Sequence, residues 1–293
     1  MIPVWRLAKS KVDFDSDNGL LKIWYQTDQG QFYVEFRDGG EGSLAGDVIR
    51  FGRDIPEYNR SLLINGNLVV RDIPRPDYFD RYADWEGDEE DVSEELALLP
   101  IIKVDQSQHF VKVPKYKGEI STLLRCRGSS HVVHLLGKSE DDKLVFNRCT
   151  PCFEYIAGRN RTKTLIKSWM LQLVDGVAFL HSQGIIHRDL KGLNILFDEA
   201  GRVVICDLEC HWADLMYLAD ECKGYKNFTA ASDVYALGGC LWYFCYANTP
   251  LISVIQFIVP PPFNTVLEAC HCKCPEDRPS IAELHHMLEV LEV

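Results

Sequence analysis

Hydrophobic positions in the first part of the chain alternate in short runs that predict β-strands. Residues 20–26 and 31–36 are apolar and aromatic, and a polar turn that ends in glycine separates them, which is typical of a hairpin. Residues 62–64 and 68–70 form a second pair around an Asn-Gly turn, whose left-handed dihedrals favour a tight reversal. We therefore expect a β-rich N-terminal region over residues 1–75.

Further along, short apolar runs predict a small group of strands with one helix among them. Residues 101–104 and 110–113 are expected to pair as adjacent antiparallel strands, and residues 144–146 should form another strand. Residues 119–127 suit a short helix between them. This part of the chain should therefore form a small, strand-rich lobe.

Helical periodicity dominates the rest of the chain. Apolar side chains recur every three to four residues on one face of a helix that should end near Gly184. Residues 231–247 and 280–291 also predict helices. The apolar run over residues 241–259 is interrupted by polar residues and proline, so it indicates a buried helix followed by a loop and no membrane span. The residues of the first helix face are Leu165, Trp169, Leu173, Val177 and Leu180.

Charge is concentrated in one segment. The formal net charge is −12, and residues 77–95 contain ten acidic residues and one arginine, which sum to −9. Such a run is usually a solvated linker, and it argues against nucleic acid as a partner because phosphate binding needs a basic surface. We expect three parts: a β-rich region over residues 1–75, an acidic linker over 76–95 and a larger domain over 96–293.

The cysteines indicate a reducing environment. The chain has eleven cysteines and no apolar signal segment near residue 1, which predicts unpaired thiols and an intracellular, cytoplasmic location. The cluster Cys270-His271-Cys272-Lys273-Cys274 could suggest zinc, but it lacks a second ligand pair at the spacing of a zinc finger.

One polar stretch carries the most specific signal. Residues 187–194 read His-Arg-Asp-Leu-Lys-Gly-Leu-Asn, and Asp207 follows thirteen residues after the asparagine. An Asp-x-Lys pair by itself would more often be a surface salt bridge. The full pattern, however, resembles the H-R-D-x-x-x-x-N loop and the D-F-G element of the eukaryotic-type serine/threonine protein kinases. The resemblance covers residues 92–293 and implies a bilobal α+β fold, with a small β-rich N-lobe, a large helical C-lobe and an N-terminal β-rich extension.

The resemblance also implies roles for these residues. Asp189 would accept the proton of the substrate hydroxyl or orient it, and Lys191 would neutralise the transferring phosphate. Asn194 and Asp207 would supply oxygen ligands to Mg²⁺ beside ATP. Lys112 resembles the strand lysine that contacts the nucleotide phosphates, and Glu119 resembles the helix glutamate that pairs with it. Only six residues separate these two, so the connection must be short and the helix must begin almost at Glu119.

Later positions extend the resemblance. Asp233 lies in a segment similar to the kinase helix whose aspartate braces the catalytic loop. Arg278 matches the arginine of the late C-lobe signature, and Glu221 stands where the glutamate of an A-P-E motif would be. The expected structural pair is therefore Glu221 with Arg278.

Three features depart from the kinase pattern. Residues 92–100 contain no glycine, so a glycine-rich loop is missing, and the glycines of residues 39–46 are better explained as a surface loop. Glu209 replaces the glycine of D-F-G, where its carboxylate would repel phosphates or add a metal ligand. Between Asp207 and Glu221 there are thirteen residues with no serine or threonine and only Tyr217 as a hydroxyl, so the usual phosphorylation switch at Arg188 is not expected.

Two functions follow from these observations. The first is a kinase that transfers the γ-phosphate of ATP, with Mg²⁺, to a serine or threonine hydroxyl of a protein. The alternative is a pseudokinase, a nucleotide-binding or scaffold module with a protein partner and little or no catalysis. A small-molecule phosphotransferase is a distant third, because its catalytic loop usually lacks the arginine and lysine found at positions 188 and 191.

Overall fold

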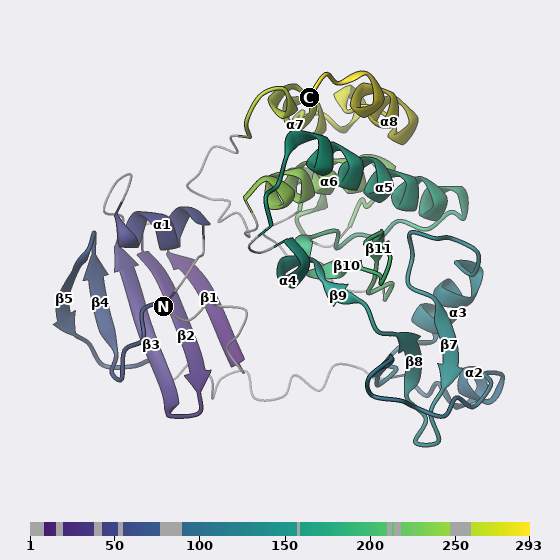
Figure 1. Ribbon diagram of the computed structural model, residues 1–293, viewed down its shortest axis with the longest axis horizontal. Helices are drawn as coiled ribbons and strands as arrows, with labels where there is room; N and C mark the ends of the chain where they lie inside the picture. Colours follow the sequence, from purple (N-terminus) through teal and green to yellow (C-terminus); the bar gives the residue numbers. More distant parts are fainter. Residues whose placement is uncertain are drawn as a thin grey trace. The chain divides into compact units, whose positions relative to one another are not determined.

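The computed structural model describes two compact units, one within residues 9–76 and one within residues 90–293 (Figure 1). The described residues are 9–15, 20–37, 43–51, 55–76, 90–156, 159–209, 213, 218–224, 226–246 and 259–293. Most of the predicted acidic linker, residues 77–89, lies outside this set. So do Tyr217 and residues 247–258, which hold the predicted loop after the buried apolar run.

The first unit is a five-stranded sheet with one helix. Both predicted hairpins are confirmed, because β2 pairs antiparallel with β3, and β4 pairs antiparallel with β5. Strands β3 and β4 are parallel, which requires a crossover connection, and α1 lies in that connection (Figure 1). The sheet order is β1-β2-β3-β4-β5. The elements are β1 (Lys9–Asp15), β2 (Leu20–Thr27), β3 (Gly30–Arg37), α1 (Leu44–Phe51), β4 (Leu62–Asn65) and β5 (Leu68–Asp72).

Helix α1 corrects one expectation about the glycine-rich segment of residues 39–46. We expected a surface loop, but Leu44 to Gly46 form the first turn of α1, and Ala45 is fully buried. Residues 39–42 lie outside the described set. Apolar residues in the second half of the segment explain the difference, because they gain more from packing on the sheet than glycine loses in helix propensity.

The second unit begins with a small lobe built on a three-stranded sheet of order β6-β8-β7. The expected pairing of residues 101–104 with 110–113 is wrong. Ile101 makes a single parallel bridge to Lys138 on β7, and β6 pairs with β8 instead. The elements of the lobe are α2 (Ser93–Ala97), β6 (His109–Lys112), α3 (Lys117–Arg125), β7 (Leu135–Lys138) and β8 (Leu144–Asn147).

The larger lobe is mostly helical, as the periodicity predicted. Its long helix α5 buries Trp169, Leu173, Val177 and Leu180 and ends at Ser182, just before Gly184 with φ +68°. The elements are β9 (Thr150–Pro151), α4 (Cys152–Ile156), α5 (Lys163–Ser182), the 3₁₀ turn η3 (Gly192–Asn194), β10 (Ile195–Phe197), β11 (Val203–Ile205), η5 (Asp220–Cys222), α6 (Ala230–Tyr246), α7 (Phe263–Cys270), η6 (Pro275–Asp277) and α8 (Ile281–Val290). Among the described helices, none has the length and apolar character needed to cross a membrane.

Helix α6 forms the centre of the C-lobe core. Twelve of its seventeen residues are buried, including the charged Asp233, which is 1% exposed. A helix that is apolar on every side lies inside a domain. A buried charge is costly unless it is hydrogen-bonded, so the side chain of Asp233 needs hydrogen-bond donors inside the core.

Candidate active site

The loop that carries the predicted catalytic residues is held by hydrogen bonds from its backbone to Asp233 of α6. One oxygen of the Asp233 carboxylate accepts a hydrogen bond from the backbone N–H of His187 (2.9 Å), and the other accepts one from the N–H of Arg188 (3.0 Å). His181 of α5 contacts the same carboxylate through Nε2 at 2.9 Å. Arg188 has a φ of +72°, a strained conformation for a residue with a side chain, and these bonds stabilise it.

Three of the predicted site residues meet on this loop. The Nζ atom of Lys191 lies 2.9 Å from Oδ2 of Asp189. The Nδ2 atom of Asn194 donates to the same Oδ2 at 2.9 Å and to the backbone carbonyl of Asp189 at 2.8 Å. The Asp189 carboxylate is thus held in one orientation by two donors from its own loop.

The hairpin of β10 and β11 brings Asp207 to this loop. Ile195 pairs with Ile205, and the N–H of Cys206 donates to the carbonyl of Asn194 at 3.0 Å. His187 closes the arrangement, since its Nε2 contacts the carbonyl of Cys206 at 3.0 Å. Asp207 follows directly, with a φ of +65°. The two residues predicted to bind metal, Asn194 and Asp207, therefore flank one hairpin at its open end, where β10 begins and β11 ends.

Lys112 and Glu119 also meet, as the sequence predicted. Lys112 is the last residue of β6, and α3 begins at Lys117 after only four residues, so Glu119 falls in the first turn of the helix. The Nζ atom of Lys112 lies 2.7 Å from Oε1 of Glu119 and 2.8 Å from Oδ1 of Asp207. The lysine thus connects the small lobe to the hairpin of the large lobe.

Glu209 adds a contact that the sequence did not predict. Its Oε1 lies 2.7 Å from the Nζ atom of Lys112, so the ammonium group is surrounded by three carboxylates. One oxygen from each of Glu119, Asp207 and Glu209 lies within 4.8 Å of the others. The Oε2 atom of Glu119 is buried without a hydrogen-bond partner in the described structure.

The electrostatics of the cluster follow from burial and charge. Burial raises the pKa of Glu119, and the neighbouring carboxylates add to this, although Lys112 opposes it. Burial alone would lower the pKa of Lys112, but the charges of Glu119 and Asp207 outweigh it and hold the pKa above its ordinary value. Lys112 therefore stays protonated. Burial, with Asp207 nearby, raises the pKa of the Cys206 thiol to about 12, so this thiol stays protonated near neutral pH.

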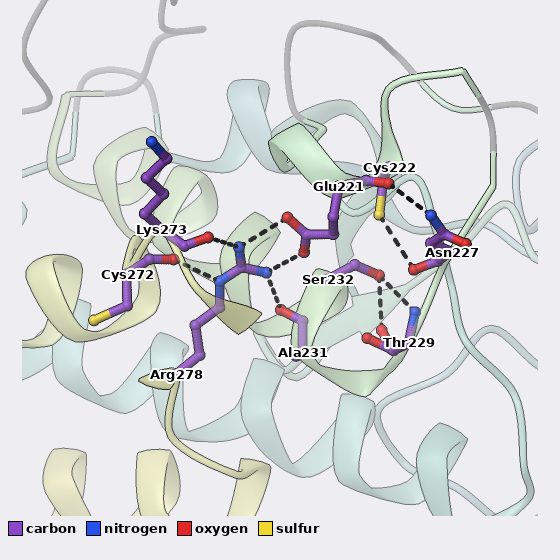
Figure 2. A network of polar contacts seen from close by, with 9 residues as sticks. All are labelled: Glu221, Cys222, Asn227, Thr229, Ala231, Ser232, Cys272, Lys273 and Arg278. Atoms are coloured by element: carbon purple, nitrogen blue, oxygen red, sulfur yellow. Dashed lines mark hydrogen bonds and ion pairs between the residues drawn. The ribbon is translucent and has the colours of Figure 1, made fainter. Parts of the chain in front are cut away.

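The expected pair of Glu221 with Arg278 is present (Figure 2). The guanidinium Nη2 donates to Oε2 of Glu221 at 3.0 Å, and Nη1 contacts Oε1. The same group donates to the backbone carbonyls of Ala231, Cys272 and Lys273, and the Arg278 side chain is only 1% exposed. Figure 2 shows these acceptors gathered around the guanidinium from η5, the start of α6 and the turn after α7. The pair therefore joins three segments of the C-lobe.

Two departures from the kinase pattern have structural counterparts. The segment without glycine, residues 92–100, forms the short helix α2 and a turn, and over residues 90–108 only Ile101 has a strand-like bridge. No glycine-rich hairpin is therefore present in this part of the described chain. The guanidinium carbon of Arg188, for which no phosphorylated partner is expected, lies 5.4 Å from the centre of the Phe228 ring, a cation–π contact.

Sequence reasoning missed His181, Phe228 and the direction of Glu209. His181 belongs to no motif, and its contact with Asp233 depends on how α5 and α6 pack. Glu209 was noticed because it replaces a glycine, but its pairing with Lys112 depends on the backbone at Asp207. Among the described residues, Glu119, Asp207 and Glu209 form the one group of acidic, histidine or cysteine side chains with spacing for a metal, and no side chain of the Cys270–Cys274 segment belongs to it.

Comparison with known proteins agrees with this architecture. The protein kinase domain family matches residues 93–288, which is most of the chain, and the chain belongs to the protein kinase superfamily. Both lobes and all the residues of the site lie inside the matched range. The β-rich unit before residue 77 lies outside it.

Several kinases are similar in sequence. A probable serine/threonine-protein kinase of Dictyostelium discoideum is 25% identical over 227 residues, which is 64% of this chain and 24% of that protein. The human mitogen-activated protein kinase kinase kinase 7 is 29% identical over 149 residues, 40% of this chain and 25% of its own. The kinase kinase kinase YODA of Arabidopsis thaliana is 35% identical over 99 residues, 30% of this chain and 11% of its own. The aligned part is therefore a quarter or less of each relative's length.

Proposed function

We propose that the chain is an ATP- and Mg²⁺-dependent protein kinase that phosphorylates serine or threonine residues of a protein substrate and has an atypical nucleotide site. The observation that carries the proposal is the order of the catalytic loop, in which Lys191 and Asn194 both donate to Asp189 while Asp233 holds the backbone. Phosphoryl transfer depends mainly on positioning and on charge stabilisation, and this loop is built for both.

Asp189 and Lys191 would act on the substrate hydroxyl. The Asp189 carboxylate is 14% exposed, enough to accept a hydrogen bond from a serine or threonine hydroxyl and orient its oxygen toward the phosphate. Lys191 lies 2.9 Å from it and would neutralise the charge that develops on the transferring group. Nucleophile orientation and charge stabilisation would therefore come from one loop.

Asn194 and Asp207, at the open end of the β10–β11 hairpin, offer oxygen atoms that fit a magnesium ion. Mg²⁺ prefers hard oxygen ligands, and when bound it would neutralise charge on the phosphate oxygens. The carboxylate of Asp207 is 39% exposed. Asn194 uses its Nδ2 to hold Asp189, which leaves its amide oxygen as the atom for a cation. Glu119 would keep Lys112 directed at the nucleotide phosphates, through the 2.7 Å contact between them.

A pseudokinase is the second candidate, and two observations favour it. Glu209 binds the lysine that nucleotide phosphates would need, and residues 92–100, which precede the lysine-bearing strand where a glycine-rich loop is expected in sequence, form α2 and a turn instead. Both features weaken nucleotide binding without disturbing the catalytic loop. A module of this kind would use the same fold to bind a protein partner.

Transfer of radiolabelled phosphate from ATP, to the protein itself and to casein, distinguishes the two candidates. We would compare the wild-type chain with Asp189→Asn, which keeps the size of the side chain and removes its charge. Asp175→Asn, on an exposed part of α5, is the matched control. The kinase proposal expects transfer by wild type and control, and at least a hundredfold loss in Asp189→Asn. Equal incorporation in all three proteins would refute it. A thermal shift with Mg²⁺ and ATP but no transfer would favour the pseudokinase.

A further inference from the structure

The side chain of Glu209 has no role in the proposed transfer, yet it points at the centre of the site. It is 20% exposed, and its Oε1 lies 2.7 Å from Nζ of Lys112. Glu119 and Asp207 occupy the same ammonium group at 2.7 and 2.8 Å. An ammonium group carries three N–H donors, so three carboxylates at these distances match its whole capacity. A phosphate oxygen could bind Lys112 closely only if one carboxylate moved away.

Two of the three carboxylates are held in place more firmly than the third. Glu119 is 2% exposed and fixed in the first turn of α3. Asp207 directly follows Cys206, whose N–H donates to the carbonyl of Asn194 (3.0 Å) and whose own carbonyl contacts Nε2 of His187 (3.0 Å). Glu209 lies two residues further on, beyond the end of the hairpin. Glu209 is therefore the carboxylate that can leave Lys112 with the least change in structure.

The charge of the cluster indicates what would make it leave. Three carboxylates face one ammonium group, and their oxygens lie within 4.8 Å of one another. This leaves two negative charges uncompensated, and nucleotide phosphates would add more. Carboxylates this close repel each other and attract a divalent cation, whose preferred ligands are carboxylate oxygens.

We propose that Glu209 makes nucleotide binding depend on a divalent cation more steeply than Asp207 and Asn194 alone would. Without the cation, Glu209 stays on Lys112 and competes with the phosphates. With the cation, Glu209 turns to it beside Asp207, and a donor of Lys112 becomes available to a phosphate oxygen. This inference rests on the nucleotide binding that the proposed function requires. By linkage, nucleotide and cation each raise the affinity of the other by the same factor.

Equilibrium binding of a fluorescent ADP analogue, in 5 mM Mg²⁺ and in EDTA, measures this dependence. The quantity to compare is the ratio of the two affinities in wild type, Glu209→Gln and Glu209→Gly. Mg²⁺ binds the analogue in solution equally in every case, so differences between proteins report the site. Glu268→Gln, exposed on α7, is the control for net charge.

We expect the ratio to fall about tenfold in both Glu209 variants, mainly because they bind the analogue more tightly in EDTA. The control should keep the wild-type ratio. A fall of less than threefold overturns the inference while leaving the proposed function intact, provided that the proteins bind the analogue.

Acylation of Lys112 by an amine-reactive ester, read by peptide mass spectrometry without nucleotide, tests the exchange itself. Mg²⁺ should raise the acylation rate of Lys112 severalfold in wild type and leave it unchanged in Glu209→Gln. No effect of Mg²⁺ on the wild-type lysine overturns the inference. If Mg²⁺ has this effect but no protein binds the analogue, the exchange at Lys112 stands and the proposed nucleotide-dependent function fails.

Discussion

The ion pair of Glu221 with Arg278 should contribute strongly to the stability of the kinase unit. We consider Glu221→Gln and Arg278→Met, alone and combined. The arginine side chain is 1% exposed and the glutamate 20%. Burial alone would raise the pKa of Glu221, but the hydrogen bond and charge of Arg278 outweigh it and hold the pKa below its ordinary value. The charged form of the pair is therefore the one that the fold stabilises.

The contacts that each substitution removes determine how the losses of stability rank. Breaking a buried pair by removing one partner costs about 3–5 kcal/mol. In Glu221→Gln the guanidinium keeps three backbone carbonyls as acceptors, and the new amide oxygen can still accept one bond, so we expect a loss of about 2–3 kcal/mol. Arg278→Met also removes the bonds to those carbonyls and should cost about 4–5 kcal/mol. The double variant should cost little more than Arg278→Met, a coupling of about 2 kcal/mol.

Urea unfolding followed by thiol labelling measures these values. All eleven cysteines lie after residue 125, so labelling reports the kinase unit and not the N-terminal sheet. Cys240 is fully buried in α6 and becomes reactive only when that helix opens. A loss of 2–3 kcal/mol should lower the urea midpoint by about 1 M. A coupling below about 0.5 kcal/mol would refute the reasoning, because the two side chains would then contribute independently.

Three further predictions test other parts of the structure. Burial, helped by the charge of Arg278, lowers the pKa of His271 to about 4. Neutral His271 therefore stabilises the fold above pH 6.5, the ordinary pKa of histidine, and this contribution is lost as the pH falls toward 4. Between pH 7 and pH 5 the loss amounts to about 2 kcal/mol. Calorimetry should therefore show a smaller acid-induced drop in Tm for His271→Phe than for wild type, and equal drops would contradict the assignment. Gly192→Ala would place a Cβ 2.4 Å from the buried ring of Tyr243. It should cost about 1–3 kcal/mol of stability and reduce phosphoryl transfer. The control Gly118→Ala, whose Cβ would have nothing within 4 Å, should be neutral or slightly stabilising. Asp233→Asn should cost about 2–3 kcal/mol of stability, because it weakens the bonds that hold the loop. It should lower kcat with little change in the KM for ATP, since Asp233 touches no substrate. A change confined to KM would contradict this role.

The sequence predicted the four longest of the eight described α-helices, α3, α5, α6 and α8, because their apolar residues recur within a short stretch of the chain. The face of α5 and the hairpin of β2 and β3 follow from residues close together in the chain, and both are confirmed. The pairing of β6 was wrong because strand partners are chosen by packing across the lobe: β6 pairs with β8, whose first residue lies thirty-two positions after the end of β6, and not with its neighbour in sequence.

The site divides in the same way. Asp189, Lys191 and Asn194 were predictable because one short loop holds them together, and the short connection before α3 made the meeting of Lys112 with Glu119 predictable as well. Glu209 was not, since a sequence shows a carboxylate in an unusual place but not the direction in which its backbone points it. His181 was not predictable either, because it reaches the site through the contact between two helices.

The bonds that Asp233 makes also bear on how the molecule unfolds. Its carboxylate joins α6, the loop at His187 and Arg188, and His181 on α5. The loop has little regular secondary structure, yet it cannot open without breaking its two hydrogen bonds to Asp233 on α6. We therefore expect this loop to open together with α6. In hydrogen exchange, the amides of His187 and Arg188 should exchange as slowly as the core of α6, even though ordinary surface loops exchange within seconds to minutes.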